Sequence, residues 1–140
     1  MRSPQTLASN IASRCSMIGK NGCLAFTYIW CMYLDPEDGS AIELVANAMR
    51  NGNIDDECTV KAEPFLEELT GKRFCVEKRK IKSLSELKKI DRCAVLFSMD
   101  GRTGHWVGVE HGVVKFNSLE TSINVMEGKP ISARIITLKE

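Results

Sequence analysis

The chain has 140 residues, of which 44% are hydrophobic and 26% charged, and its net charge is +1. These values are ordinary for a globular protein, so we predict a single domain over residues 1–140. A net charge this small supplies no overall field that would attract nucleic acid or a membrane surface, and we expect neither as a partner. The one basic run, residues 77–82, contains no aromatic residue on which bases could stack.

The cysteine and histidine content argues against a metal site. There are six cysteines but no Cys-x-x-Cys pair, and the chain has only two histidines. We therefore expect neither a metal nor another cofactor. The first residues lack the apolar core of a secretory leader, so we expect a cytoplasmic protein whose cysteines are reduced.

The first half of the chain is predicted to be helical. A weak apolar stripe predicts a short helix over residues 3–14, with Pro4 in its first turn, followed by a loop over residues 15–22. Residues 23–34 then form a run of twelve with one polar member, Thr27. A helix this apolar must be buried on nearly all sides. It would be about 18 Å long, too short for the roughly 30 Å core of a bilayer, so we predict a buried core helix.

Two further helices are predicted before the chain changes character. Ser40 is expected to cap a helix over residues 41–50, whose apolar residues recur at helical spacing. The residues of that face are Ile42, Val45, Ala46 and Met49. A helix over residues 62–69 is expected to end at Gly71 in a C-terminal cap.

The second half of the chain is predicted to form strands. The predicted strands cover residues 74–76, 93–97, 105–110, 113–117 and 134–138. Residues 93–97 are continuously apolar, which predicts a central strand. Ser83 and Glu86 match a capping box for a one- or two-turn helix. Helices first and strands last predict an α+β domain in which a buried helix packs on a mostly antiparallel sheet.

Cys23 is the candidate nucleophile. It follows an Asn-Gly turn and begins the apolar helix, where we expect it to be exposed. A thiol at a helix N-terminus lies at the positive end of the helix dipole, which favours the reactive thiolate. Such a thiol needs a base within hydrogen-bond reach, and the base needs a group that orients it.

His105 is the candidate base. It opens a predicted strand directly after a polar loop, so its ring would be held firmly and still be accessible. The other histidine, His111, lies in a tight hairpin turn, where an exposed histidine without a catalytic role is expected.

Asn117, on the following strand, is the candidate orienting residue, and the hairpin register decides its role. If Glu110, His111 and Gly112 form a three-residue loop, His105 pairs with Asn117 and the two share a face of the sheet. If His111 and Gly112 form a two-residue turn, Asn117 faces away and Ser118 lies opposite His105. Glycine as the third loop residue suits the longer loop, so we expect Asn117.

These residues resemble the motifs of the papain-like cysteine peptidase superfamily. Gly22-Cys23 opens an apolar helix, and Gly104-His105-Trp106-Val107 opens a strand. Within the superfamily the layout looks most like the bacteriocin-leader peptidase type and related uncharacterised bacterial papain-like domains. The resemblance implies a papain-like fold, a peptide or protein substrate, and an acyl-enzyme mechanism. By position it assigns Cys23 as nucleophile, His105 as general base and Asn117 as orienting residue.

One departure from the superfamily pattern concerns the oxyanion. The superfamily usually has a glutamine a few residues before the cysteine, whereas this chain has none there; Ser16 and Asn21 are the candidate donors. Loss of one donor typically costs roughly a hundredfold or more in rate. A papain-like domain that binds a peptide or protein without cleaving it is therefore an alternative. A second is a phage-derived amidohydrolase that cuts cell-wall peptides, whose Gly-His-Val stretch is similar to residues 104–107.

Overall fold

The computed structural model describes residues 22–118 and 127–139. Within these ranges, three α-helices precede a five-stranded sheet, which confirms the predicted α+β class. The helix predicted over residues 3–14 lies outside the described residues. The helices are α2 (Cys23–Cys31), α3 (Gly39–Arg50), α4 (Ala62–Thr70) and the short 3-10 helix η1 (Leu84–Leu87). The strands are β1 (Phe74–Lys80), β2 (Arg92–Ser98), β3 (His105–Glu110), β4 (Val113–Phe116) and β5 (Lys129–Leu138).

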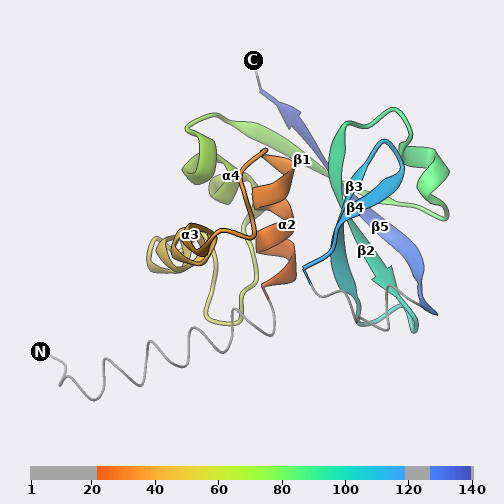
Figure 1. Ribbon diagram of the computed structural model, residues 1–140, viewed down its shortest axis with the longest axis horizontal. Coiled ribbons are helices and arrows are strands. Elements are labelled where there is room, and N and C mark those ends of the chain that lie inside the picture. The colour runs from red at the N-terminus through yellow and green to blue at the C-terminus, as the bar shows by residue number, and fades with distance from the viewer. Residues whose placement is uncertain (1–21, 119–126, 140) are drawn as a thin grey trace, which may run out of the picture.

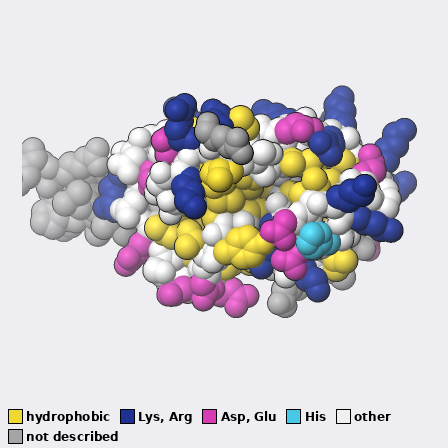
Figure 2. All heavy atoms as spheres, turned by 90° about the horizontal axis from the view of Figure 1, so that it is seen from above, with side chains coloured by type: hydrophobic (Ala, Val, Ile, Leu, Met, Phe, Trp, Pro, Cys, Tyr) yellow, Lys and Arg dark blue, Asp and Glu magenta, His cyan; other side chains and the backbone are white. Residues whose placement is uncertain are grey.

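The strands form one antiparallel sheet in the order β1-β5-β2-β3-β4. β2 is the middle strand, as its apolar sequence predicted. Helix α2 packs on β2 and β3, and α4 packs on β1, so the three α-helices form a layer on one side of the sheet (Figure 1). On the face shown in Figure 2, basic and acidic side chains both appear, in keeping with the small net charge. None of the helices in the described ranges is long and apolar enough to cross a bilayer.

Helix α2 is the buried core helix that its composition predicted. Ala25, Tyr28 and Ile29 are each at most 1% exposed. The helix ends at Cys31, however, three residues earlier than predicted. Tyr33 adopts a left-handed backbone with a φ of 61° and is 61% exposed, so apolar composition alone overestimated the length of the helix.

Gly108 allows α2 to lie close to the sheet. A β-carbon at this position of β3 would lie 2.6 Å from Cζ3 of Trp30, which is closer than van der Waals contact. The Trp30 ring thus occupies the space above a residue that has no side chain. This contact places the C-terminal half of α2 directly over β3.

Helix α3 differs from its prediction in its cap and in its buried face. Asp38, not Ser40, is the N-cap residue, and its carboxylate accepts a hydrogen bond from the Ser40 backbone N–H. Ile42 is 48% exposed, because the face against the core is built mainly from small residues that allow close packing. The buried residues of α3 are Ala41, Val45, Ala48 and Met49.

Strands β1 and β5 are longer than predicted. Their ladder runs without interruption from the pair Phe74 and Leu138 to the pair Lys80 and Ser132. The charged residues 77–80 of β1 interrupt the alternation of apolar and polar residues that predicts a strand. An edge strand with one solvated face nevertheless accommodates charges readily. Cys75 of β1 is exposed for the same reason.

The short helix η1 confirms the predicted capping box. The Ser83 hydroxyl accepts from the backbone of the first turn, while the Glu86 carboxylate accepts from the Ser83 backbone N–H at 3.0 Å. Leu87 of this helix is fully buried on the other face of the sheet from α2, in a cluster with Val107 and Val109 of β3.

Candidate active site

Cys23 is the first residue of α2 and follows the N-cap Gly22. Gly22 has no side chain, so no side-chain oxygen caps the first backbone N–H groups of α2. The backbone N–H groups of Cys23 and Leu24 instead lie near the thiol. The thiol is half-buried, which is less exposed than we predicted. It contacts the backbone N–H of Trp106, the residue that follows His105 on β3.

The protonation state of Cys23 differs from the expectation. Burial raises the pKa of the Cys23 thiol, and the opposing effect of the backbone N–H groups of Trp106, Leu24 and Cys23 itself is smaller. Desolvation therefore outweighs the helix terminus, and the prediction of a thiolate at neutral pH is wrong for the thiol on its own. A neutral thiol can still attack a carbonyl if a base removes its proton.

His105 supplies an imidazole at the start of β3. Its side chain is 6% exposed, and β3 holds it opposite Phe97 of the middle strand. Burial lowers the pKa of His105, while the hydrogen bond to Asn117 raises it by a smaller amount. The imidazole is accordingly neutral at pH 7, which is the form that can accept a proton.

Asn117 orients this imidazole. The distance between His105 Nε2 and Asn117 Oδ1 is 2.8 Å. Because an amide oxygen only accepts, Nε2 carries the proton and Nδ1 bears the lone pair. The asparagine thus selects the tautomer in which the nitrogen nearer the backbone, Nδ1, is able to accept a proton.

The register that brings Asn117 to His105 is not the one we favoured. Glu110 pairs with Val113, so His111 and Gly112 form a two-residue turn, with φ angles of 49° and 78°. The two-residue turn alone would direct Asn117 away from His105. A β-bulge then shifts the pairing by one residue, since Val109 pairs with Val114 but Gly108 pairs with Phe116. Lys115 is the extra residue, and the shift returns Asn117 to the face of His105.

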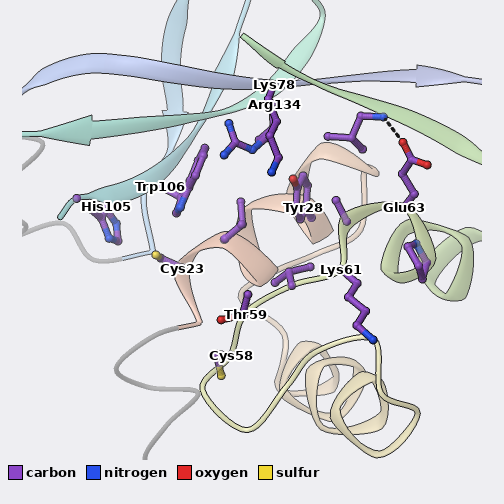
Figure 3. A pocket seen from close by; sticks show the side chains of 16 residues that line it. Cys23, Tyr28, Cys58, Thr59, Lys61, Glu63, Lys78, His105, Trp106 and Arg134 are labelled. Atoms are coloured by element: carbon purple, nitrogen blue, oxygen red, sulfur yellow. Dashed lines mark hydrogen bonds between the residues drawn. The ribbon is translucent and has the colours of Figure 1, made fainter. Parts of the chain in front are cut away.

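Cys23 and His105 lie at the same end of a cleft between the helical layer and the sheet (Figure 3). The cleft has a volume of about 860 Å³ and is open to solvent along its length. The Trp106 ring forms part of its wall next to the thiol, and Tyr28 of α2 forms part of its floor. A space of this size and shape accommodates several residues of an extended peptide.

The cleft also contains charged residues that the sequence did not single out. Lys61, Lys78 and Arg134 line it, together with one carboxylate, Glu63. Lys78 and Arg134 are far apart in the chain and meet only because they are paired in the register of β1 and β5. The signal that could have revealed them was a correct pairing of these two strands.

The remaining site predictions have separate outcomes. Ser16 and Asn21, the candidate oxyanion donors, lie outside the described residues. His111 is exposed, as expected for a turn residue, and its Nδ1 lies 3.1 Å from the carbonyl oxygen of Lys88. The five cysteines within the described ranges are all free thiols.

Comparisons of the chain with known proteins found no relative. No protein-family model, no curated protein and no solved structure matches it. A function for the chain must therefore be inferred from the chemistry of the site.

Proposed function

We propose that this protein is a thiol hydrolase with a papain-like arrangement of residues, which cleaves a peptide or amide bond through an acyl-enzyme. Cys23 is the nucleophile, His105 the general base and Asn117 the orienting residue. The observation that carries the proposal is that the Cys23 thiol contacts the backbone beside His105 in a cleft, while Asn117 holds the far nitrogen of the same imidazole.

The reaction follows from the protonation states of the free site. Nδ1 of His105 accepts the thiol proton as the Cys23 sulfur attacks the substrate carbonyl, and a tetrahedral oxyanion forms. The imidazolium then donates that proton to the departing amine, and the C–N bond breaks to leave a thioester. Water, deprotonated by the same imidazole, attacks the thioester, the C–S bond breaks to release the carboxylic acid, and the imidazolium returns its proton to the sulfur. The backbone N–H of Cys23 supplies one hydrogen bond to the oxyanion.

The geometry also favours selectivity for Cys23 over the other cysteines. Cys31 and Cys93 are buried in apolar surroundings, and burial raises the pKa of both thiols, that of Cys93 to about 11. Cys75 is exposed but stands on the edge strand β1 without a histidine neighbour among the described residues. Cys58 also lines the cleft, but it is buried and burial raises the pKa of its thiol. Cys23 is the cysteine of the cleft that contacts the backbone beside His105.

The test is a cleavage screen with the full chain. We expect the protein to cleave members of a mixed peptide library, with the products read by mass spectrometry, and the variant Cys23→Ala to cleave none. Cys75→Ala is the matched control and should cleave like the unmodified protein. If Cys23→Ala and Cys75→Ala behave alike, the catalytic assignment of Cys23 is wrong.

A module that binds a peptide without cleaving it is the second candidate. The absence of a glutamine shortly before Cys23 favours it, because that residue would supply the second hydrogen bond to the oxyanion. This candidate predicts that the library yields no products, and that Cys23→Ala retains full affinity for the peptides that bind.

A further inference from the structure

Two cationic side chains, Lys78 and Arg134, lie next to each other in the cleft. Trp106 lies between them and the Cys23 thiol (Figure 3). Lys78 of β1 and Arg134 of β5 are directly paired across the antiparallel ladder. Directly opposed side chains have β-carbons about 5 Å apart, and like charges in this position destabilise a sheet. Both head groups point into the cleft between Trp106 and Tyr28 (Figure 3).

Within the described residues, no carboxylate neutralises this pair. Neither Arg134 nor Lys78 forms an ion pair with another described residue, although four ion pairs are present elsewhere in the described ranges. Glu63 is the one acidic residue that lines the cleft, but it is engaged elsewhere. One of its oxygens accepts from the Val76 backbone N–H at 2.9 Å, and the other lies 3.7 Å from Lys139 Nζ.

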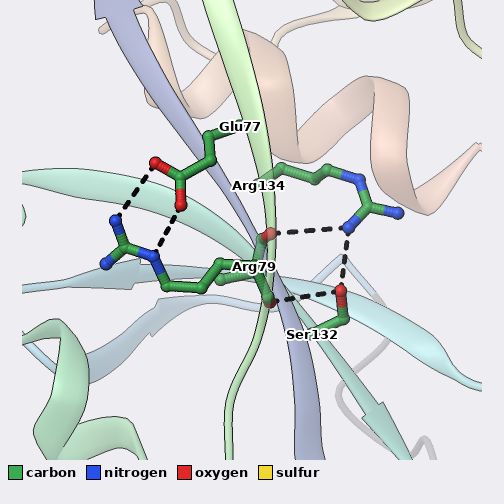
Figure 4. A network of polar contacts seen from close by, with 5 residues as sticks. Glu77, Arg79, Ser132 and Arg134 are labelled. Carbon is green, nitrogen blue, oxygen red and sulfur yellow. Dashed lines mark hydrogen bonds and ion pairs between the residues drawn. The ribbon is translucent and has the colours of Figure 1, made fainter.

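The guanidinium of Arg134 is held in place by Ser132 and by the Trp106 ring. Its Nη1 donates to the Ser132 hydroxyl at 2.8 Å, and that hydroxyl is linked in turn to the Arg79 carbonyl (Figure 4). Its flat face lies 4.7 Å from the centre of the Trp106 ring. An arginine has five N–H donors. The contacts with Ser132 and with the Trp106 ring leave the other donors of Arg134 available to a group in the cleft.

Tyr28 adds a neutral donor beside the two cations. Tyr28 is a residue of α2 that lines the cleft together with Lys78 and Arg134 (Figure 3). Burial raises the pKa of Tyr28, so the hydroxyl keeps its proton and can donate it. An oriented arginine, a lysine and a phenol that converge on one space are the donors that a carboxylate accepts.

We infer that Lys78, Arg134 and Tyr28 form a subsite that binds a carboxylate of the substrate, on the side of Trp106 away from Cys23. This inference rests on the proposed function, since it names the chemistry of what the cleft takes. The carboxylate belongs to an acidic side chain or to the C-terminus of a peptide, and both sources present the same two oxygens to the subsite.

The first test compares a charged and a neutral alkylating reagent on Cys23. Iodoacetate carries a carboxylate and iodoacetamide does not, so the ratio of their rates at Cys23 reports attraction by the subsite. We expect Lys78→Gln and Arg134→Gln each to lower this ratio by about twofold, the effect of one unit charge roughly 10 Å away in a water-like dielectric. Lys78 is exposed, so Lys78→Gln should fold normally.

Lys89→Gln is the matched control, because it removes an exposed cation that follows η1, away from the cleft. An unchanged ratio in both subsite variants would overturn the inference, and so would an equal fall in Lys89→Gln. The absolute rate with iodoacetamide reports the reactivity of Cys23 itself. If Cys23 reacts slowly with iodoacetamide but the ratio of the two rates still falls in Lys78→Gln and Arg134→Gln, the proposed hydrolase activity is contradicted and the subsite is supported.

The second test identifies the source of the carboxylate by protection of Cys23 from iodoacetamide. Three peptides of one sequence are compared: one with an internal Glu and an amidated end, one with Gln and a free C-terminus, and one with neither carboxylate. We expect one of the first two to protect more strongly than the third, and Lys78→Gln to remove the difference. Equal protection by all three, or none by any, would contradict the subsite.

Discussion

At the scale of single residues, the candidate site is a pair of neutral groups. Burial moves the pKa of the Cys23 thiol up and that of the His105 imidazole down, so neither is charged in the free site at neutral pH. Proton transfer then accompanies the attack of sulfur on the substrate. This differs from a site in which thiolate and imidazolium are formed before the substrate arrives.

This pairing predicts the pH dependence of Cys23 alkylation by iodoacetamide. His105 can act as a base only when it is deprotonated, so reactivity should be lost as the pH falls through its pKa, which lies below the ordinary value of 6.5. In His105→Ala the thiol must ionise alone, and reactivity should appear only above the ordinary thiol value of about 8.5. His111→Ala should keep the profile of the unmodified protein. Identical profiles for both variants would show that His105 is not the base.

At the scale of elements, the β3–β4 hairpin determines which side chain meets His105. The bulge at Lys115 places Asn117 on the correct face. Deletion of Lys115 removes the extra residue but leaves Gly108 opposite Phe116, so Asn117 should stay on the face of His105 and peptide cleavage in the library screen should be retained. Asn117→Ala removes the oxygen that orients the imidazole and should lower cleavage by about tenfold or more. The hypothesis fails if Asn117→Ala folds, as judged by circular dichroism, and cleaves normally.

The close approach of α2 to β3 gives a second prediction at this scale. Gly108→Ala should destabilise the protein by about 1–3 kcal/mol, because a methyl group would overlap the Trp30 ring. The free energy of unfolding in urea measures this. Gly39→Ala is the control, since a β-carbon there meets nothing within 4 Å. A similar stability for both variants would mean that Trp30 can move aside at little cost.

The same elements show what could be predicted from the sequence. The buried helix, the central strand and the capping box followed from local patterns of side chains, and the structure confirms them. The ends of β1 and the hairpin register did not follow. Edge strands tolerate charges that hide their pattern, and a bulge is a backbone choice that no side-chain periodicity reports. The cations of the cleft depend on that unpredicted pairing, so Arg134 and Lys78 were missed together.

At the scale of the whole molecule, the candidate site is divided between two layers. Cys23 belongs to the helical layer, whereas His105 and Asn117 belong to the sheet. Their alignment therefore depends on contacts between the layers that lie away from the cleft. Arg92 of β2 makes such a contact with the C-terminal part of α2.

Arg92 joins the layers in several ways at once. It donates to the Trp30 carbonyl at 2.7 Å and to Glu110 at 2.9 Å, and its guanidinium stacks on the rings of Trp30 and Tyr33. Lysine cannot reproduce this geometry, so Arg92→Lys should lower the free energy of unfolding by roughly 1–2 kcal/mol.

Urea denaturation provides the measurement for Arg92→Lys. Arg79→Lys is its control, because Arg79 forms an exposed ion pair with Glu77 on the edge strand, and this change should leave the free energy of unfolding unchanged. Equal losses for the two variants would mean that Arg92 contributes no more than a surface charge.

The bulge at Lys115 also has a consequence for how such a hairpin can vary. Compared with a three-residue turn, the two-residue turn shifts the strand pairing by one residue, and the bulge shifts it by one more. The total shift of two residues keeps Asn117 on the same face of the sheet as His105. The site thus requires that the total shift in pairing between β3 and β4 be an even number of residues, and it does not require one particular turn. A relative with a three-residue turn and no bulge would present the same asparagine. Among hairpins with the same number of residues between the histidine and the asparagine, the length of the turn and the presence of the bulge should therefore change together.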